Sequence, residues 1–287
     1  MIKHRSDHTT ERQDNERRTI FPPADRHRHG IGFRHRAATA VALAKAGMDV
    51  GGITWHSDQQ GAEETAEEVR GLGRKAVVHQ LDTTDVRGGT AVAIDKLAEE
   101  LGGVDVFVNN SGTGDGTKFL ELDYDTWMST LDTNLNGGAF VAMQTAAKRM
   151  VKAGRGGRII AVTSVHEFQP RVGASAYDAS KHGLGGLIKT MALELAEHGI
   201  TANNVAPGEI ATPMTGQEDE DPTQKERPGV PLGRPPGDAR EVAAVIAFLA
   251  SPDSSYVNGA SWPVDGGMLQ MGPQAGSHIT SNDWRES

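Results

Sequence analysis

The chain of 287 residues contains no cysteine, which excludes disulfide bonds, thiolate zinc sites and thiol catalysis. It also lacks an apolar run of membrane-spanning length, so we expect no membrane partner. No basic stripe is paired with aromatic residues, and the formal net charge is -9, so we expect no nucleic-acid partner. The N-terminal segment has no apolar stretch typical of a secretory signal, and a cytoplasmic location is therefore expected.

Strand-like and helix-like segments alternate along most of the chain. Strands are predicted at residues 19–21, 49–55, 75–81, 104–108, 158–163, 201–205 and 260–264. Helices are predicted at residues 37–46, 59–72, 86–101, 124–152, 175–197 and 240–250. This alternation predicts an α/β fold with a doubly wound, mostly parallel sheet and helices on both faces. We expect a single domain over residues 19–268, between a disordered arm (1–18) and a C-terminal tail (269–287).

Tyr177 and Lys181 are four residues apart in the predicted helix 175–197, so they share one face of that helix. A lysine at this distance is expected to lower the phenol pKa from about 10 toward the range of a general acid or base. Ser164 follows the predicted buried strand 158–163, and Asn134 lies in the preceding helical segment.

The order Asn134, Ser164, Tyr177-x-x-x-Lys181 resembles the catalytic tetrad of the short-chain dehydrogenase/reductase family. The resemblance extends, with gaps, from about Gly30 to Met268, and includes 3-oxoacyl reductases and glucose 1-dehydrogenases without separating their substrates. It implies a three-layer Rossmann-type fold, NAD(P)-dependent hydride transfer between a carbonyl and an alcohol, and a homotetramer or homodimer.

The same resemblance implies a role for each residue of the tetrad. Tyr177 transfers the proton, and Ser164 donates a hydrogen bond to the reacting oxygen. Lys181 also holds the nicotinamide ribose, and Asn134 positions a water that relays protons to Lys181. The expected substrate is a small carbonyl or alcohol.

Further motifs stand where predicted strands end, which is where ligands bind in an open parallel sheet. Gly30-Ile31-Gly32 precedes the helix 37–46, a position where a pyrophosphate meets a helix N-terminus. By resemblance, the adenine and adenosine contacts are Asp82, Thr83, Asn110 and Gly112, and the nicotinamide contacts are Pro207, Gly208, Ile210 and Thr212. Taken alone, Asp82 has the alternative interpretation of a turn or helix-cap residue, the Asn110 segment that of a strand-end turn, and the Pro207 segment that of a loop.

The segment 22–36 departs from the family pattern Thr-Gly-x-x-x-Gly-Ile-Gly, because Asp25 and Arg26 occupy its first positions. The strand 19–21 is short and is followed by Pro22-Pro23, which suits neither a central strand nor a tight glycine turn. About four extra residues, 33–36, separate Gly32 from the predicted helix.

Two interpretations of this segment stay open. It is either a remodelled site in which Arg26, Arg28 or His29 contacts phosphate, or a sequence error or decayed site. The second interpretation favours an alternative function, a non-catalytic scaffold or sensor with this fold.

The predicted cofactor is NADP, with NAD as the alternative. The second strand ends Thr54-Trp55-His56-Ser57, without the carboxylate that would bind both ribose hydroxyls of NAD. We therefore expect His56 and Ser57 beside the 2′-phosphate.

Four residues between Ser164 and Tyr177 are predicted to line the substrate pocket: His166, Phe168, Gln169 and Val172. A loop histidine is the more usual interpretation of His166 than a second acid. Residues 214–231 occupy the place of a mobile lid. No metal site is predicted, because His27, His29 and His35 lie in a flexible basic stretch without fixed ligand geometry.

Overall fold

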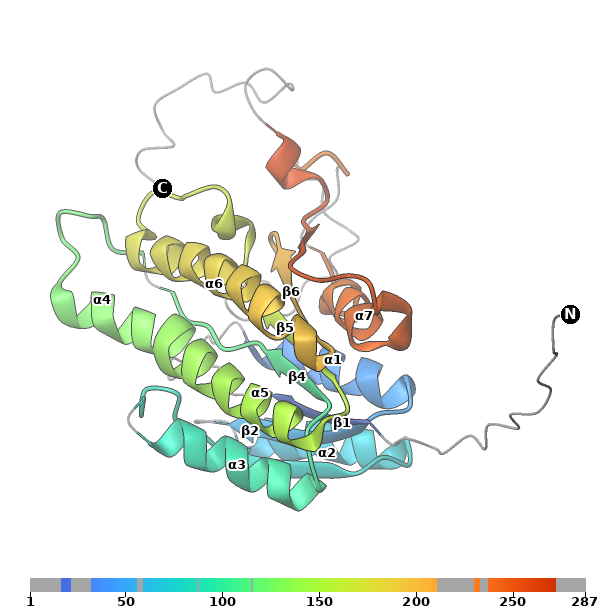
Figure 1. Cartoon of the computed structure of the whole chain (residues 1–287). Helices are drawn as coiled ribbons and strands as arrows, with labels where there is room; N and C mark the ends of the chain where they lie inside the picture. Colours follow the sequence, from blue (N-terminus) through green and yellow to red (C-terminus); the bar gives the residue numbers. More distant parts are fainter. Residues whose placement is uncertain are drawn as a thin grey trace, which may run out of the picture.

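A seven-stranded parallel sheet forms the centre of the protein (Figure 1). The structure, a computed structural model, describes residues 17–21, 32–55, 59–86, 88–114, 116–210, 230–232 and 237–271. The strands are β1 Arg18–Phe21, β2 Asp49–Trp55, β3 Ala76–Gln80, β4 Val106–Asn109, β5 Gly157–Val162, β6 Ile200–Pro207 and β7 Ser261–Val264. Their order in the sheet is β3-β2-β1-β4-β5-β6-β7. The predicted doubly wound α/β architecture is confirmed.

Helices cover both faces of this sheet (Figure 1). One face packs against α1 Gly32–Lys45, α2 Gln59–Gly71 and α7 Ala239–Ala250. The other face packs against α3 Gly89–Leu101, α5 Ala142–Ala153 and α6 Ser175–Glu194. Successive residues of β4 contribute to the cores on opposite faces of the sheet. Val106 and Val108 pack into the core beneath α1, α2 and α7, while Phe107 packs into the core beneath α3, α5 and α6. Because side chains alternate along a strand, a sheet covered on both faces needs apolar residues in succession.

β1 is a central strand, although the sequence suggested that Pro22-Pro23 would exclude it from the sheet interior. It pairs with β2 on one side and β4 on the other, and Ile20 is completely buried. The prediction is wrong because the strand ends at Phe21, before the prolines, so no N–H is removed from its own ladder. Four residues are enough when both neighbouring strands supply partners.

The helix predicted from residue 37 begins at Gly32. Residues 33–36, expected to be an insertion before the helix, therefore form its first turn. No extra loop separates Gly32 from α1.

The helical segment predicted over residues 124–152 is helical throughout but changes type in its middle. It consists of α4 Tyr124–Leu131, the π-helical stretch η1 Asp132–Val141, and α5. A Cβ atom on Gly137 would lie 1.8 Å from the backbone oxygen of Thr83, so the wide turn passes directly against the loop that follows β3. This close approach explains why a glycine is needed there.

None of the helices among the described residues combines the length and apolar character needed to cross a membrane. Residues 1–16 and 272–287, which make up most of the predicted arm and tail, lie outside the described residues. The limits of the domain therefore stay a prediction.

Candidate active site

The strand order reverses between β1 and β4, which are neighbours in the sheet. From β1 the chain proceeds outward through β2 and β3, and it then returns to form β4 to β7 on the other side. The carboxyl ends of strands flanking such a reversal are where open α/β sheets bind ligands. The residues that follow β4 and β5 therefore mark the candidate site.

Three side chains at the end of β4 are buried with polar atoms that have no hydrogen-bond partner among the described residues. These atoms are Asn109 Nδ2, Asn110 Nδ2 and Ser111 Oγ. Unsatisfied buried polar groups cost free energy, so native proteins usually retain them where a ligand or water completes them. These atoms lie beside the reversal of strand order, where a dinucleotide bound to this fold would reach them. The predicted contacts Asn110 and Gly112 belong to the same segment.

Tyr177, Lys181 and Ser164 come together where α6 crosses the end of β5. Lys181 is buried, and its Nζ donates a hydrogen bond of 3.0 Å to the carbonyl oxygen of Val162, the last residue of β5. The same nitrogen lies 5.5 Å from the centroid of the Tyr177 ring. Ser164, two residues beyond β5, is close enough to Tyr177 that its hydroxyl lowers the pKa of the Tyr177 phenol. The predicted proximity of these three residues is thus present in the fold.

The pKa of Tyr177 differs from the sequence-based expectation. Burial raises this pKa above 10, and the hydrogen bond from Ser164 only partly opposes the shift. Lys181 was expected to lower it, but its ammonium group is directed to the Val162 carbonyl rather than to the phenolic oxygen. Desolvation of the phenolate is therefore the largest influence on the pKa of Tyr177, and it favours the neutral phenol.

Burial acts on Lys181 in the opposite direction. Loss of hydration disfavours the ammonium form and lowers the pKa of Lys181 to about 8, against a raising effect of the Glu167 charge. Lys181 is therefore close to titrating in the range where enzymes commonly work.

Asn134 lies in η1 and uses its side chain to connect two segments. Its Oδ1 accepts a hydrogen bond of 2.7 Å from the Thr113 N–H, and its Nδ2 donates to the Thr113 carbonyl (2.8 Å) and to Ser180 Oγ (2.9 Å). Ser180 Oγ in turn donates to the carbonyl oxygen of Tyr177 (2.6 Å). Both amide hydrogens are used, so the side chain ties the segment after β4 to the helix of Tyr177.

The sequence analysis missed Glu167, a buried acidic residue in the short helix η2 Val165–Glu167. Its Oε2 accepts hydrogen bonds of 2.7 Å from Thr163 Oγ1 and from Ser261 Oγ of β7. Its Oε1 lies against Gly185 of α6, where a Cβ would be only 2.5 Å away. The sequence signal was a glutamate three residues after Ser164, but only the fold shows that it is enclosed beside Lys181.

The structure describes some of the other predicted cofactor residues and not others. Asp82 accepts hydrogen bonds from the backbone N–H (2.9 Å) and the hydroxyl (2.6 Å) of Thr84, so it does stabilise a turn. Pro207 ends β6, and Gly208 donates a hydrogen bond of 3.0 Å to the Val264 carbonyl of β7. Gly32 opens α1, Thr83 follows β3, and Ile210 follows β6. Gly30, Ile31, His56, Ser57 and Thr212 lie outside the described residues, as do Arg26, Arg28, His29 and most of the predicted lid.

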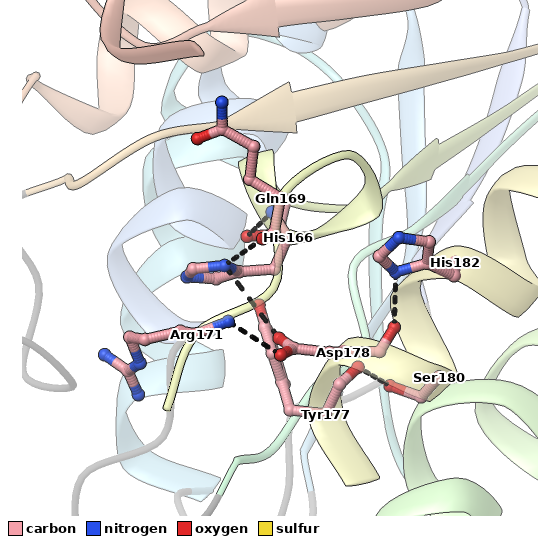
Figure 2. Close-up of polar contacts among 8 residues, drawn as sticks. His166, Gln169, Arg171, Tyr177, Asp178, Ser180 and His182 are labelled. Atoms are coloured by element: carbon pink, nitrogen blue, oxygen red, sulfur yellow. Dashed lines mark hydrogen bonds and ion pairs between the residues drawn. The ribbon is translucent and has the colours of Figure 1, made fainter. Parts of the chain in front are cut away.

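His166 lies beside Tyr177 at the outer end of the site (Figure 2). The two rings meet edge to face, with centroids 5.9 Å apart and an interplanar angle of 77°. His166 Nδ1 is 2.8 Å from the carbonyl oxygen of Gln169 and 3.9 Å from Asp178 Oδ1. The Asp178 carboxylate also accepts the backbone N–H of Arg171 (2.8 Å), which holds the loop against the start of α6. Of the predicted pocket residues, Phe168, Gln169 and Val172 are exposed, and His166 is half-buried.

Comparison with known proteins agrees with this arrangement. The family described as enoyl-(acyl carrier protein) reductase matches residues 27–269. An uncharacterized oxidoreductase, YohF of Escherichia coli, is 47% identical over 235 residues, which are 82% of this chain and 91% of that protein. The chain belongs to the short-chain dehydrogenase/reductase family.

Two other members show the range of the family. The L-rhamnose 1-dehydrogenase (NAD(P)(+)) of Azotobacter vinelandii is 37% identical and covers 82% of this chain and 88% of its own length. The crystal structure of acetoin dehydrogenase from Enterobacter cloacae is 42% identical, with a TM-score of 0.80 and coverage of 90% of this chain and 97% of that one. The predicted enzyme class, an NAD(P)-dependent short-chain dehydrogenase/reductase acting on CH–OH groups, is confirmed at the level of the family.

Proposed function

We propose that this short-chain dehydrogenase/reductase interconverts a small ketone and its secondary alcohol, with Tyr177 as the general acid and base. The observation that supports this most directly is the cluster of Tyr177, Ser164 and Lys181 at the end of β5, next to the reversal of strand order. A nicotinamide cofactor, when bound, supplies or accepts the hydride at the reacting carbon.

The residues of this chain handle the oxygen and its proton. Ser164 donates a hydrogen bond to the carbonyl oxygen, so charge that develops there meets a donor already in place. Tyr177 gives its proton to the same oxygen during reduction, and its raised pKa keeps it protonated for this step. The positive charge of Lys181 then stabilises the phenolate that remains. A proton returns to the phenolate by way of Lys181, which is reprotonated from solvent, and oxidation of the alcohol follows these steps in reverse.

Asn134 is proposed to act by fixing the site's geometry and by positioning a water that reprotonates Lys181. Its side-chain amide hydrogens already bind Thr113 and Ser180, which supports the first role. The water would have to use the second lone pair of Oδ1 or the backbone carbonyl of Asn134.

The proposed cofactor site runs from the N-terminus of α1 to the end of β4 and on to β6. Its proposed contacts are Gly30, Ile31, Gly32, His56, Ser57, Asp82, Thr83, Asn110, Gly112, Pro207, Gly208, Ile210 and Thr212. We propose NADP as the preferred form, because the sequence offers His56 and Ser57 rather than a carboxylate after β2. Comparison of kcat/KM with NADPH and with NADH tests this choice, and a clear preference for NADH would contradict it.

For the substrate we propose a small hydroxylated ketone or diol of the acetoin type. The 42% identity to an acetoin dehydrogenase over 90% of this chain supports a short, polar substrate. Acetoin carries a hydroxyl on the carbon next to its carbonyl, so its reduction yields a vicinal diol.

The test is a fluorescence titration of the purified full-length chain with NADPH and NADH, followed by a panel of carbonyl substrates. We expect saturable binding and carbonyl-dependent oxidation of the cofactor. The alternative, a non-catalytic scaffold or sensor, predicts no oxidation with any carbonyl, and no cofactor binding if the segment 22–36 is disabled. Resequencing the gene across that segment decides whether its unusual composition is genuine.

We further propose a cytoplasmic homo-oligomer, a tetramer or dimer, built from one domain over residues 19–268 with an arm and a tail. Light scattering coupled to size exclusion measures the oligomeric state directly. Limited proteolysis tests the domain limits, since an arm and tail of the predicted kind are cleaved before the domain.

A further inference from the structure

His166 carries a polar ring beside Tyr177 that has no part in the proton transfer described above. It projects from η2, the turn that begins immediately after Ser164, and its ring meets the ring of Tyr177 edge to face. Figure 2 shows the His166 ring beside Tyr177. Since Ser164 and Tyr177 are both proposed to bind the reacting oxygen, a substituent on the neighbouring carbon of a bound substrate would lie close to this imidazole.

The hydrogen bonds of His166 determine which ring nitrogen remains for a ligand. Nδ1 is 2.8 Å from the Gln169 carbonyl oxygen, and a carbonyl only accepts hydrogen bonds, so Nδ1 carries the hydrogen. The nearby carboxylate of Asp178, 3.9 Å from Nδ1, favours the same assignment. In a neutral imidazole with hydrogen on Nδ1, Nε2 is an acceptor.

A hydroxyl group suits Nε2 in either charge state of the ring, because a hydroxyl both donates and accepts hydrogen bonds. An apolar substituent at the same place would leave Nε2 without a partner as the substrate displaces water. A site of this kind favours a substrate whose hydroxyl is on the carbon next to the carbonyl. The His166 side chain is 24% exposed, so it is enclosed enough for this loss to matter and open enough to be reached.

We propose that His166 determines specificity by binding the hydroxyl adjacent to the reacting carbon, which makes α-hydroxy ketones and vicinal diols the preferred substrate class. This inference rests on the proposed dehydrogenase function and adds the residue that selects the substrate. Gln169 acts as a positioning residue, because its backbone carbonyl holds Nδ1 and so orients Nε2.

The test compares acetoin with 2-butanone, which differs from it by the absence of that hydroxyl. In His166→Asn, the amide nitrogen stands near the position of Nδ1, so the bond to Gln169 can persist while Nε2 is lost. In His166→Gln, the amide extends toward the position of Nε2 instead. We expect the ratio of kcat/KM for acetoin to that for 2-butanone to fall about ten- to hundredfold in His166→Asn. His166→Gln should retain a larger part of the preference.

His182 provides a matched control, because its Nδ1 bonds the Asp178 carbonyl (2.9 Å) but its side chain is exposed on α6. His182→Asn should leave the ratio unchanged. A purely structural role for His166 would lower both rates together and leave their ratio at the parental value, which would overturn the inference. Failure of the parental chain to oxidise NADPH or NADH with either ketone, or with the wider carbonyl panel, would instead contradict the proposed function itself.

Discussion

The ammonium group of Lys181 donates a hydrogen bond of 3.0 Å to the carbonyl oxygen of Val162. This contact anchors α6 to the end of β5 and places the lysine beside the Tyr177 ring. The same contact buries the amino group of Lys181 between α6 and the end of β5. Burial lowers the pKa of this group, and a lowered pKa makes stability depend on pH.

The first prediction concerns stability against pH. The pKa of Lys181 is about 8 in the folded chain, and the unfolded chain has the ordinary value of 10.5. Below pH 8 both states hold the proton, whereas between about pH 8 and 10.5 the unfolded state binds more protons, so stability rises with pH. Relative to Lys181→Met, the parental free energy of unfolding should increase by about 2–3 kcal/mol from pH 7.5 to 10. Urea unfolding at both pH values measures this, and a constant difference would contradict it.

The second prediction concerns the hydroxyl of Tyr177. Tyr177→Phe keeps the ring that contacts His166 but removes the proton donor and the partner of Ser164. We expect kcat for ketone reduction to fall about 10²- to 10⁴-fold, the usual contribution of a general acid. Binding of NADPH should change little. Tyr256→Phe, at a fully exposed tyrosine, is the control and should behave like the parent. Near-parental turnover by Tyr177→Phe would refute the assignment.

The third prediction concerns Glu167, whose negative charge raises the pKa of Lys181. Glu167→Gln keeps the size of the side chain and removes the charge, so the pKa of Lys181 should fall further. In a plot of kcat/KM against pH, the limb that reflects the titration of Lys181 should move to lower pH. Ser261→Ala removes one hydroxyl donor to Glu167 but leaves the carboxylate, and it should reduce stability by about 1 kcal/mol. A profile that moves equally in both variants would argue against the charge effect.

The fourth prediction uses two adjacent glycines of α6. A Cβ on Gly185 would lie 2.5 Å from Glu167 Oε1, whereas a Cβ on Gly186 would have no neighbour within 4 Å. Gly185→Ala should therefore destabilise the protein by about 1–3 kcal/mol, because the buried carboxylate must move. Gly186→Ala should stabilise it by about 0.5–1 kcal/mol, since alanine favours a helix. Urea unfolding of both variants gives the comparison, and equal effects would mean that the contact with Glu167 carries no strain.

The sequence predicted element boundaries correctly where they depend on residues close together in the chain. The boundaries of β2 and α7 agree with the predicted segments to within one residue, because apolar periodicity is a short-range feature. It failed at β1 and at the start of α1, where proline and arginine suggested interruption. At β1 the partners β2 and β4 are distant in sequence, so local composition does not reveal that this short strand is central.

The sequence alone determined the family and the spacing of Tyr177 and Lys181, because a four-residue interval on a helix needs no other part of the chain to define its face. Only the tertiary structure decided what surrounds that pair. The burial that raises the pKa of Tyr177 and lowers that of Lys181 arises where α6 lies over the end of β5. The enclosure of Glu167 depends likewise on Ser261, 94 residues away. Desolvation and long-range contacts depend on the packing of the whole chain, so residue spacing cannot specify them.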